Sequence, residues 1–406
     1  MREIAALAAG FLLIIVMIFR KVNIGTTMLT ASIVMGLMAG FGPLKVLNVL
    51  FASITEEATI RLLTVVIIIS ILSYLLERFG LLNKMADSLE ELFNNNWFSL
   101  MFLPLLVGVL SVPGGAVMSA PVVDSVGDKM GIGNVRKAAI NVAFRHFAFF
   151  LFPFSTTIIL ATQVSGVSPY TIIKYNAPIG IVFIIAGYMI FIRNSVKAAA
   201  AEAVRPSKGL PKRIGEALMY TSPLWVGIVF NLAFGLPFSL ALAPGIAIAY
   251  FLGGKDKGGF VKGMWQGINW SMIYAVAGIM CLQGFIRQMP YIAKWINDLL
   301  ESGMDIRMLM VLSSAFLGLL TGNCTAVLGM LLPLFLPLAG GAYSEVYITS
   351  LLFSVSFVFY FISPMHLCQV FTTEYFKVNV KEYYWEYRLY WPILFLAIIV
   401  LYFFVY

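Results

Sequence analysis

Long continuous apolar segments alternate with short polar loops along this 406-residue chain. A helix crosses the hydrocarbon core of a bilayer with about 20 apolar residues, whereas a membrane β-strand alternates apolar and polar positions. The continuous segments therefore predict an all-α membrane protein. We expect about ten transmembrane helices, at residues 4–19, 24–41, 60–76, 138–161, 169–192, 217–234, 237–252, 264–285, 343–362 and 391–405.

Two further apolar segments, at 97–123 and 308–338, are broken in the middle by small and turn-forming residues. The interruptions lie at 111–115 and 321–325. Proline breaks a helix, and glycine allows backbone conformations that are closed to other residues. We therefore interpret both segments as re-entrant hairpins that enter and leave the membrane on one side.

Charged residues make up only 11% of the chain and hydrophobic residues 61%, which excludes an ordinary soluble enzyme. With the N-terminus placed outside, 19 of the 27 Lys and Arg residues fall in inside loops and 7 outside, and Arg145 lies within a span. Because Lys and Arg accumulate in cytoplasmic loops, both termini are predicted outside. The net charge of +8 reflects this bias and implies no nucleic-acid partner. We expect the inner (cytoplasmic) membrane of a prokaryote.

A basic polar segment near the middle of the chain, at 194–213, is interpreted as a cytoplasmic linker. A shift of 210 positions aligns Gly108 with Gly318 and Ala116 with Ala326, and it brings the two hairpins into register. The sequence thus predicts two repeats, 1–193 and 214–406, each with five spans and one hairpin. An odd number of spans gives the repeats opposite orientations, as in many secondary transporters.

The hairpin tips are candidate binding elements, because irregular backbone at membrane depth has to be buried or line a cavity. The half-helix after each tip presents free amides and a positive dipole end, which suit an anion. Hydroxyl, amide and carbonyl oxygens suit Na⁺, which we place at Asn323 and Thr325. The span after each hairpin is also interrupted, at Pro153 and Pro364. The alternative is a set of ordinary kinks packed by small residues. The candidate substrate- and ion-binding residues are Ser111, Gly114, Gly115, Ser155, Thr156, Thr321, Asn323, Thr325 and Ser363.

Arg145 and His366 are additional candidates. Arg145 either attracts a carboxylate substrate, snorkels to the interface or pairs with a carboxylate such as Asp124. His366 lies beside the second interruption, where a site role and a packing role are both open, and His146 either relays protons or packs.

Several catalytic patterns are missing from the sequence. It has no Walker A motif, no His-Glu-x-x-His motif and no Gly-x-Ser-x-Gly motif. The three cysteines lie far apart and form neither a disulfide framework nor a close-spaced metal site. We therefore expect a protein that is not an enzyme, with no cofactor and no metal other than Na⁺.

The segment from Ser111 to Pro121, its counterpart in the second hairpin and the two-repeat layout resemble the ion-transporter superfamily, which includes divalent-anion/Na⁺ symporters, citrate transporters, gluconate permeases and the large subunit of dicarboxylate transporters. The chain is most similar to an integral-membrane family designated domain of unknown function 401. The resemblance implies a dimeric scaffold, a mobile transport domain and elevator-type alternating access. It also implies Na⁺ and carboxylate contacts at the tips. The first tip has Pro113 and Gly114 where the symporters have Asn and Thr.

The favoured function is secondary active transport of a small organic anion, coupled to Na⁺ or H⁺, by a homodimer in the lipid bilayer. The other hypotheses are a cation/proton antiporter of the same fold, and a channel or membrane subunit of a larger complex.

Overall fold

The computed structural model describes residues 2–93, 95–109, 115–193, 209–253, 259–340 and 343–406, whose regular structure is helical throughout. This confirms the predicted all-α membrane fold. The helices before the central linker are α1 (Arg2–Phe19), α2 (Ile24–Met38), α3 (Pro43–Thr55), α4 (Glu57–Arg78), α5 (Leu81–Phe93), α6 (Asn96–Val109), α7 (Gly115–Lys129), α8 (Asn134–His146), α9 (Ala148–Leu151), α10 (Thr156–Ser165), α11 (Pro169–Gly187) and the π-helical turn η1 (Tyr188–Ile192).

The second half of the chain continues with helices of similar lengths. They are α13 (Leu210–Phe234), α14 (Phe238–Ala241), α15 (Ala243–Leu252), α16 (Phe260–Gln266), α17 (Trp270–Arg287), α18 (Pro290–Glu301), α19 (Ile306–Thr321), α20 (Cys324–Phe335), the 3₁₀ turn η3 (Leu336–Leu338), α21 (Glu345–Phe361), α22 (Leu367–Tyr375), α23 (Val380–Glu386), α24 (Tyr390–Val400) and the π-helical turn η4 (Leu401–Val405).

Six described helical segments are long and apolar enough to cross a bilayer, and a bent pair formed by α23 with α24 and η4 raises this number to seven. Other predicted spans are shorter helices, such as α2 with 15 residues and α21 with 17. The predicted span 264–285 was wrong at its start, where α16 ends and a new helix begins. The Asn269 side chain caps α17 by accepting a hydrogen bond from the amide of Met272, which sets the start of this helix. The sequence analysis did not predict α3.

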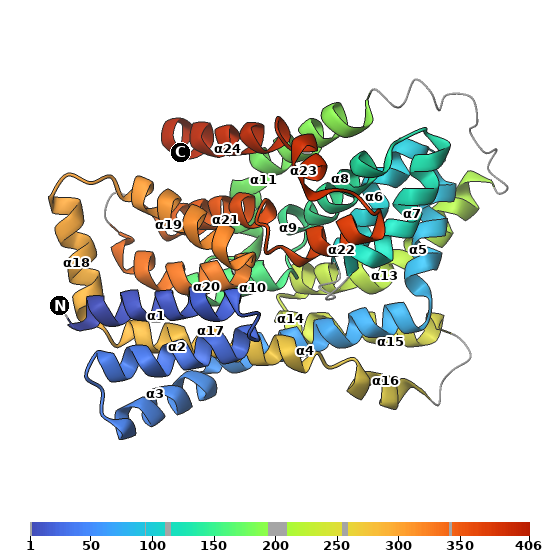
Figure 1. The fold of residues 1–406 in the computed structure, drawn as a ribbon. Coiled ribbons are helices and arrows are strands. Elements are labelled where there is room, and N and C mark those ends of the chain that lie inside the picture. The colour runs from blue at the N-terminus through green and yellow to red at the C-terminus, as the bar shows by residue number, and fades with distance from the viewer. Residues whose placement is uncertain (1, 94, 110–114, 194–208, 254–258, 341–342) are drawn as a thin grey trace.

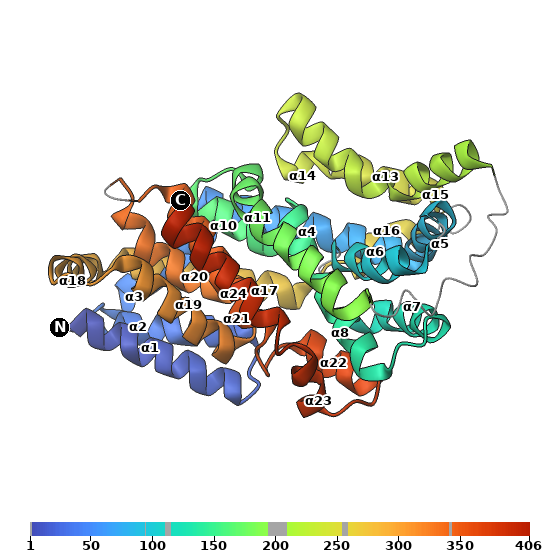
Figure 2. The same ribbon diagram turned by 90° about the horizontal axis from the view of Figure 1, so that it is seen from above.

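The helices form two layers, which Figure 1 shows one above the other. The lower layer contains α1–α4 with α15, α16 and α17, and the upper layer contains α6–α9, α11, α19 and α21–α24. Helices α10 and α20 lie between them, because α10 contacts α4 and α20 contacts α17. Phe150, Phe183 and Phe357 pack together in the upper layer and join α9, α11 and α21. Both chain ends lie towards the same end of the molecule (Figures 1 and 2).

Two strongly amphipathic helices run across the others at opposite ends of the molecule. They are α5 and α18, and each immediately precedes one of the hairpins (Figure 1). Amphipathic helices of this kind lie in the interfacial plane of a membrane, with their apolar face towards the acyl chains. Their placement marks the two ends as candidate membrane surfaces, with the other helices running between them.

The helix boundaries of the two halves correspond. A shift of 210 positions moves α4 (57–78) onto 267–288, where α17 lies, and α6 (96–109) onto 306–319, where α19 lies. The packing corresponds as well: α6 packs on α8 as α19 packs on α21, and α10 packs on α20 as α22 packs on α7. Each interrupted span therefore contacts the hairpin of the other half. The segment predicted as the second hairpin, 308–338, contains α19 and α20 with η3, and α7 extends beyond residue 123, where the first predicted hairpin ends.

Candidate functional site

The second hairpin turns at Gly322, which has a left-handed backbone with φ of 56°. Helix α19 ends at Thr321, and α20 starts two residues after Gly322 with Asn323 as its N-cap. The Asn323 Oδ1 accepts a hydrogen bond of 3.0 Å from the amide of Ala326, and Thr321 Oγ1 accepts one of 3.3 Å from the amide of Asn323. The turn is therefore held by its own hydroxyl and amide groups, with the positive end of α20 at the tip.

The first interrupted span also restarts with a capped helix. Helix α9 ends at Leu151, and α10 begins after Ser155, whose hydroxyl accepts a hydrogen bond of 3.2 Å from the amide of Ile158. Pro153 has no amide hydrogen to continue the helical ladder, which accounts for the break. The start of α10 is therefore a second positive helix end inside the protein.

The positive ends of α10 and α20 lie side by side. Thr157 on α10 and Thr325 on α20 share a hydrogen bond of 2.7 Å between their hydroxyl oxygens. Each threonine is the second residue of its helix. Two helix N-termini thus meet at a point lined by hydroxyl groups, and none of the residues that make these contacts is acidic. Such a point is electrostatically suited to an anion.

The second interruption closes against the same tip. Ser363 Oγ donates a hydrogen bond of 2.5 Å to the carbonyl of Leu319 and accepts one of 3.1 Å from the amide of Met365. A Cβ atom added to Gly322 would lie 2.7 Å from the carbonyl carbon of Met365, so the two backbones are in close contact. The structure therefore brings together the predicted residues Thr321, Asn323, Thr325 and Ser363, and it places Ser155 and Thr156 directly before Thr157.

The first hairpin tip falls mostly on the undescribed part of the chain. Ser111 and Gly114 lie outside the described residues, and Gly115 is the first residue of α7. Helix α7 packs on α22, which follows the second interruption. The predicted roles of these three residues stay predictions.

A buried polar network joins α7, α8 and α22, and sequence reasoning missed it. The Asn141 amide nitrogen donates to the carbonyl of Ala116 at 2.8 Å and to the hydroxyl of Thr372 at 3.2 Å. Its Oδ1 accepts a hydrogen bond of 2.6 Å from the hydroxyl of Ser119. An asparagine inside an apolar span is the signal that could have revealed this network.

A cavity of about 290 Å³ between α5, α6 and α7 reaches this polar network. Its lining runs from Glu77 and Gly80, at the end of the molecule where α5 lies, to Ser119. The cavity therefore extends from one of the two candidate membrane surfaces to Ser119 of the network.

Arg145 is buried in α8 with 5% of its surface exposed. Its Nη1 has no hydrogen-bond partner among the described residues. Asp124, the suggested carboxylate, instead forms an ion pair of 2.7 Å with Lys137. Arg145 is therefore buried and does not reach the surface, and its predicted role stays a prediction.

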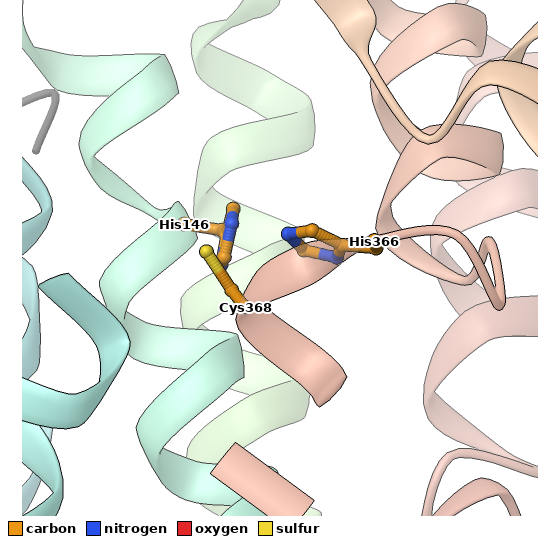
Figure 3. Close-up of side chains that lie close together, drawn as sticks. All are labelled: His146, His366 and Cys368. Atoms are coloured by element: carbon orange, nitrogen blue, oxygen red, sulfur yellow. The ribbon is translucent and has the colours of Figure 1, made fainter. Parts of the chain in front are cut away.

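The two histidines of the chain lie together, which their distance in sequence concealed. Their ring centres are 4.6 Å apart, and Cys368 lies beside them (Figure 3). The His146 ring contacts the carbonyl of Val142 through Nδ1 at 2.6 Å and the hydroxyl of Tyr360 through Nε2 at 3.0 Å. His366 is 2% exposed and lies directly after Met365, next to the tip of the second hairpin.

The helices and the long apolar segments define a multi-pass membrane protein. The chain belongs to the family described as Protein of unknown function (DUF401), whose profile matches residues 3–406. No curated protein matches it in sequence. Among solved structures, it is similar to the YdaH transporter of Alcanivorax borkumensis, whose topology is described as unusual. The two chains are 17% identical with a TM-score of 0.60, over 88% of this chain and 87% of the other. This likeness supports the fold.

Proposed function

We propose that the protein is a secondary active transporter of a small organic anion, such as a carboxylate. The observation that carries the proposal is the hydrogen bond between Thr157 and Thr325, which holds two helix N-termini together. Each terminus carries about half a positive elementary charge, and anions are stabilised there. The similarity to a solved transporter supports the transport role.

The chemistry of the tip favours an anion over an isolated cation. Ser155 and Asn323 cap the two half-helices, and Thr157 and Thr325 lie two residues further on, within the first turns. A carboxylate at this point accepts hydrogen bonds from a threonine hydroxyl and from backbone amides of the first turns. Buried Arg145 lies earlier on the same interrupted span as Ser155 and supplies a compensating positive charge.

Na⁺ or H⁺ provides the coupling in this proposal. Asn323 and Thr325 offer neutral oxygen atoms to Na⁺, and the carbonyls exposed at the turn add further ligands. A cation bound there lowers the electrostatic cost of bringing a multiply charged anion into the membrane. No nucleic acid and no organic cofactor are needed for this role.

The two-layer arrangement favours an elevator-type movement in a homodimer. The corresponding helix boundaries and the exchanged contacts of α10 with α20 and α22 with α7 support two inverted repeats around the site. In this arrangement the upper layer moves together with α10 and α20, which carry the site, and the lower layer stays fixed as the scaffold. The end of the molecule with α5 faces the cytoplasm of a prokaryote, and both termini face outward.

A thermal-shift screen of organic anions tests the proposal, with NaCl and with choline chloride. A ligand that binds only the folded protein stabilises it by about 2.7 kcal/mol at a concentration of 100 times Kd. We expect at least one anion to raise the melting temperature of the wild type and to lose this effect in Thr325→Val. Thr349→Val is the matched control, because Thr349 is a fully buried threonine near the start of α21, whereas Ser363 and the tip lie beyond the end of that helix.

Two other results point to different functions. Proton flux that depends on an inorganic cation and on no organic anion indicates a cation/proton antiporter. If no anion stabilises the protein in either salt, the organic-anion proposal fails. Uptake that needs a second protein then indicates a membrane subunit of a larger complex.

A further inference from the structure

Three metal-binding side chains converge between α8 and α22. His146 ends α8, His366 is the N-cap residue of α22, and Cys368 is the second residue of that helix. One ligand atom from each residue lies within 4.8 Å of those of the other two. Figure 3 shows the two rings and the sulfur pointing towards one another. Both histidines of the chain take part, together with one of its three cysteines.

The backbone orients both imidazole rings for coordination. His146 Nδ1 lies 2.6 Å from the carbonyl of Val142, and His366 Nδ1 lies 3.3 Å from the carbonyl of Phe361. A histidine that donates from Nδ1 to a carbonyl presents the lone pair of Nε2, which is the usual arrangement of a metal-binding histidine. The backbone therefore selects the same tautomer in both rings.

The Nε2 atom of His366 is the second indication of a ligand. It is buried and has no hydrogen-bond partner among the described residues. Buried polar atoms are nearly always paired, so an orphan ring nitrogen directed into a cluster of donors calls for a partner. The side chain as a whole is 2% exposed.

We propose that His146, His366 and Cys368 bind a transition-metal ion of Zn²⁺ type. Two imidazoles and one thiolate suit zinc, and three protein ligands leave one tetrahedral position open. Ligand atoms around tetrahedral zinc lie about 3.3–3.8 Å apart, given bond lengths of about 2.0–2.3 Å. The cluster therefore has to contract by about 1 Å when the ion binds.

Binding requires two local adjustments. The Cys368 thiol releases its proton, so that the thiolate offsets one of the two charges of the ion. The Tyr360 hydroxyl, 3.0 Å from His146 Nε2, has to give up that contact. Arg145 opposes the ion as the neighbouring cation, and the thiolate reduces this repulsion. Cys368 is partly exposed and gives the ion a path of access.

The proposal does not depend on transport of an organic anion. The cluster lies close to the second tip, because His366 directly follows Met365, whose backbone contacts Gly322. A failure of metal binding leaves the anion screen unaffected, and a failure of the anion screen leaves metal binding unaffected.

Cobalt substitution tests the site in the purified full chain, prepared with a tag that contains no histidine. We expect one equivalent of Co²⁺ to give visible bands of a tetrahedral ion and a thiolate-to-cobalt charge-transfer band. Zn²⁺ should displace both. Absence of these bands at saturating Co²⁺, or bands without the charge-transfer component, overturns the proposal.

Matched variants assign the ligands. Cys368→Ser should remove the charge-transfer band, and His366→Gln should weaken Co²⁺ binding at least about tenfold. Cys281→Ser is the control, since Cys281 is a buried free cysteine on α17, and it should leave both spectra unchanged. Equal binding in wild type, Cys368→Ser and His366→Gln contradicts the assignment.

Thiol labelling provides a test that needs no substitution and so does not depend on a variant folding. Zn²⁺ should slow maleimide modification of Cys368 at least tenfold, measured by mass spectrometry of the wild-type chain. The rate at buried Cys281 should not change. Unchanged labelling of Cys368 at saturating Zn²⁺ contradicts coordination by its sulfur.

Discussion

The half-helices α10 and α22 follow the two interrupted spans and occupy corresponding places in the two halves. Each packs on a hairpin of the other half, α10 on α20 and α22 on α7. Their N-cap residues differ in chemistry. Ser155 caps α10 with its hydroxyl, whereas His366 begins α22 without a side-chain cap and directs its ring towards His146.

The polar contacts that fasten these half-helices differ too. Thr157 joins α10 to Thr325 on α20, and Thr372 joins α22 to α7 through Asn141. One architecture thus carries two local chemistries, a point lined by hydroxyls and a cluster of ring nitrogens with a thiol. A shared fold therefore fixes where a site lies, while its side chains decide what it binds.

The largest effect is expected where the second interruption touches the tip. Gly322→Ala should lower the free energy of unfolding by about 3 kcal/mol, because it adds a Cβ at a left-handed position against the backbone of Met365. Unfolding in mixed micelles measures this loss. Gly235→Ala is the control, since its φ of 63° is similar and nothing lies within 4 Å of its Cβ. Equal losses in the two variants contradict a tight contact at the tip.

Asn141→Ala should remove the buried hydrogen bonds that hold α22 against α7 and α8. The substitution leaves the hydroxyls of Ser119 and Thr372 and the carbonyl of Ala116 without their buried partner. We expect a loss of about 2 kcal/mol in the free energy of unfolding. Hydrogen exchange of α22 should rise at the same time. A variant as stable as wild type shows that the network does not hold the two halves together.

Substitution of the N-cap residue by alanine should affect the two half-helices differently. Ser155→Ala removes an N-cap and should cost about 1 kcal/mol of stability. His366→Ala removes no cap, so the start of α22 should exchange its amides at the wild-type rate. Hydrogen exchange at the start of each helix reads out the difference. The comparison is contradicted if His366→Ala speeds exchange at the start of α22 while Ser155→Ala leaves exchange at the start of α10 unchanged.

The smallest effect is expected from the pair of threonines. A double-mutant cycle of Thr157→Val and Thr325→Val should give a coupling energy of about 0.5–1.5 kcal/mol, the usual range for one buried hydrogen bond. Stability of the wild type, both single variants and the double variant provides the four corners. A coupling energy of zero indicates that the hydroxyls do not bind each other in the membrane.

Local sequence signals predicted the interruptions well. Pro153 and Pro364 lie in the two breaks, and Gly322 and Asn323 form the second turn, because proline, glycine and a capping side chain act within a few residues. Gly108 and Gly318, aligned by the repeat, both lie against the span after their hairpin. The predicted all-α fold follows from continuous apolar segments.

Contacts between distant segments could not be predicted from the sequence. The approach of His146 to His366 depends on how α8 packs against α22, and the network of Asn141 depends on the same packing. The break between α16 and α17 was missed because Gln266, Gly267 and Asn269 alternate with large apolar residues and no proline marks the break. Short surface helices such as α3 gain stability from packing, which local propensity does not report.

Uptake into proteoliposomes tests the central claim most directly. The purified chain is reconstituted alone, and accumulation of an anion identified by the thermal-shift screen is measured with an inward gradient of Na⁺ or H⁺. We predict saturable, gradient-driven uptake that falls at least tenfold in Thr325→Val and stays at the wild-type level in Thr349→Val. Gradient-independent uptake, or equal uptake by the two variants, would contradict transport at the joined ends of α10 and α20.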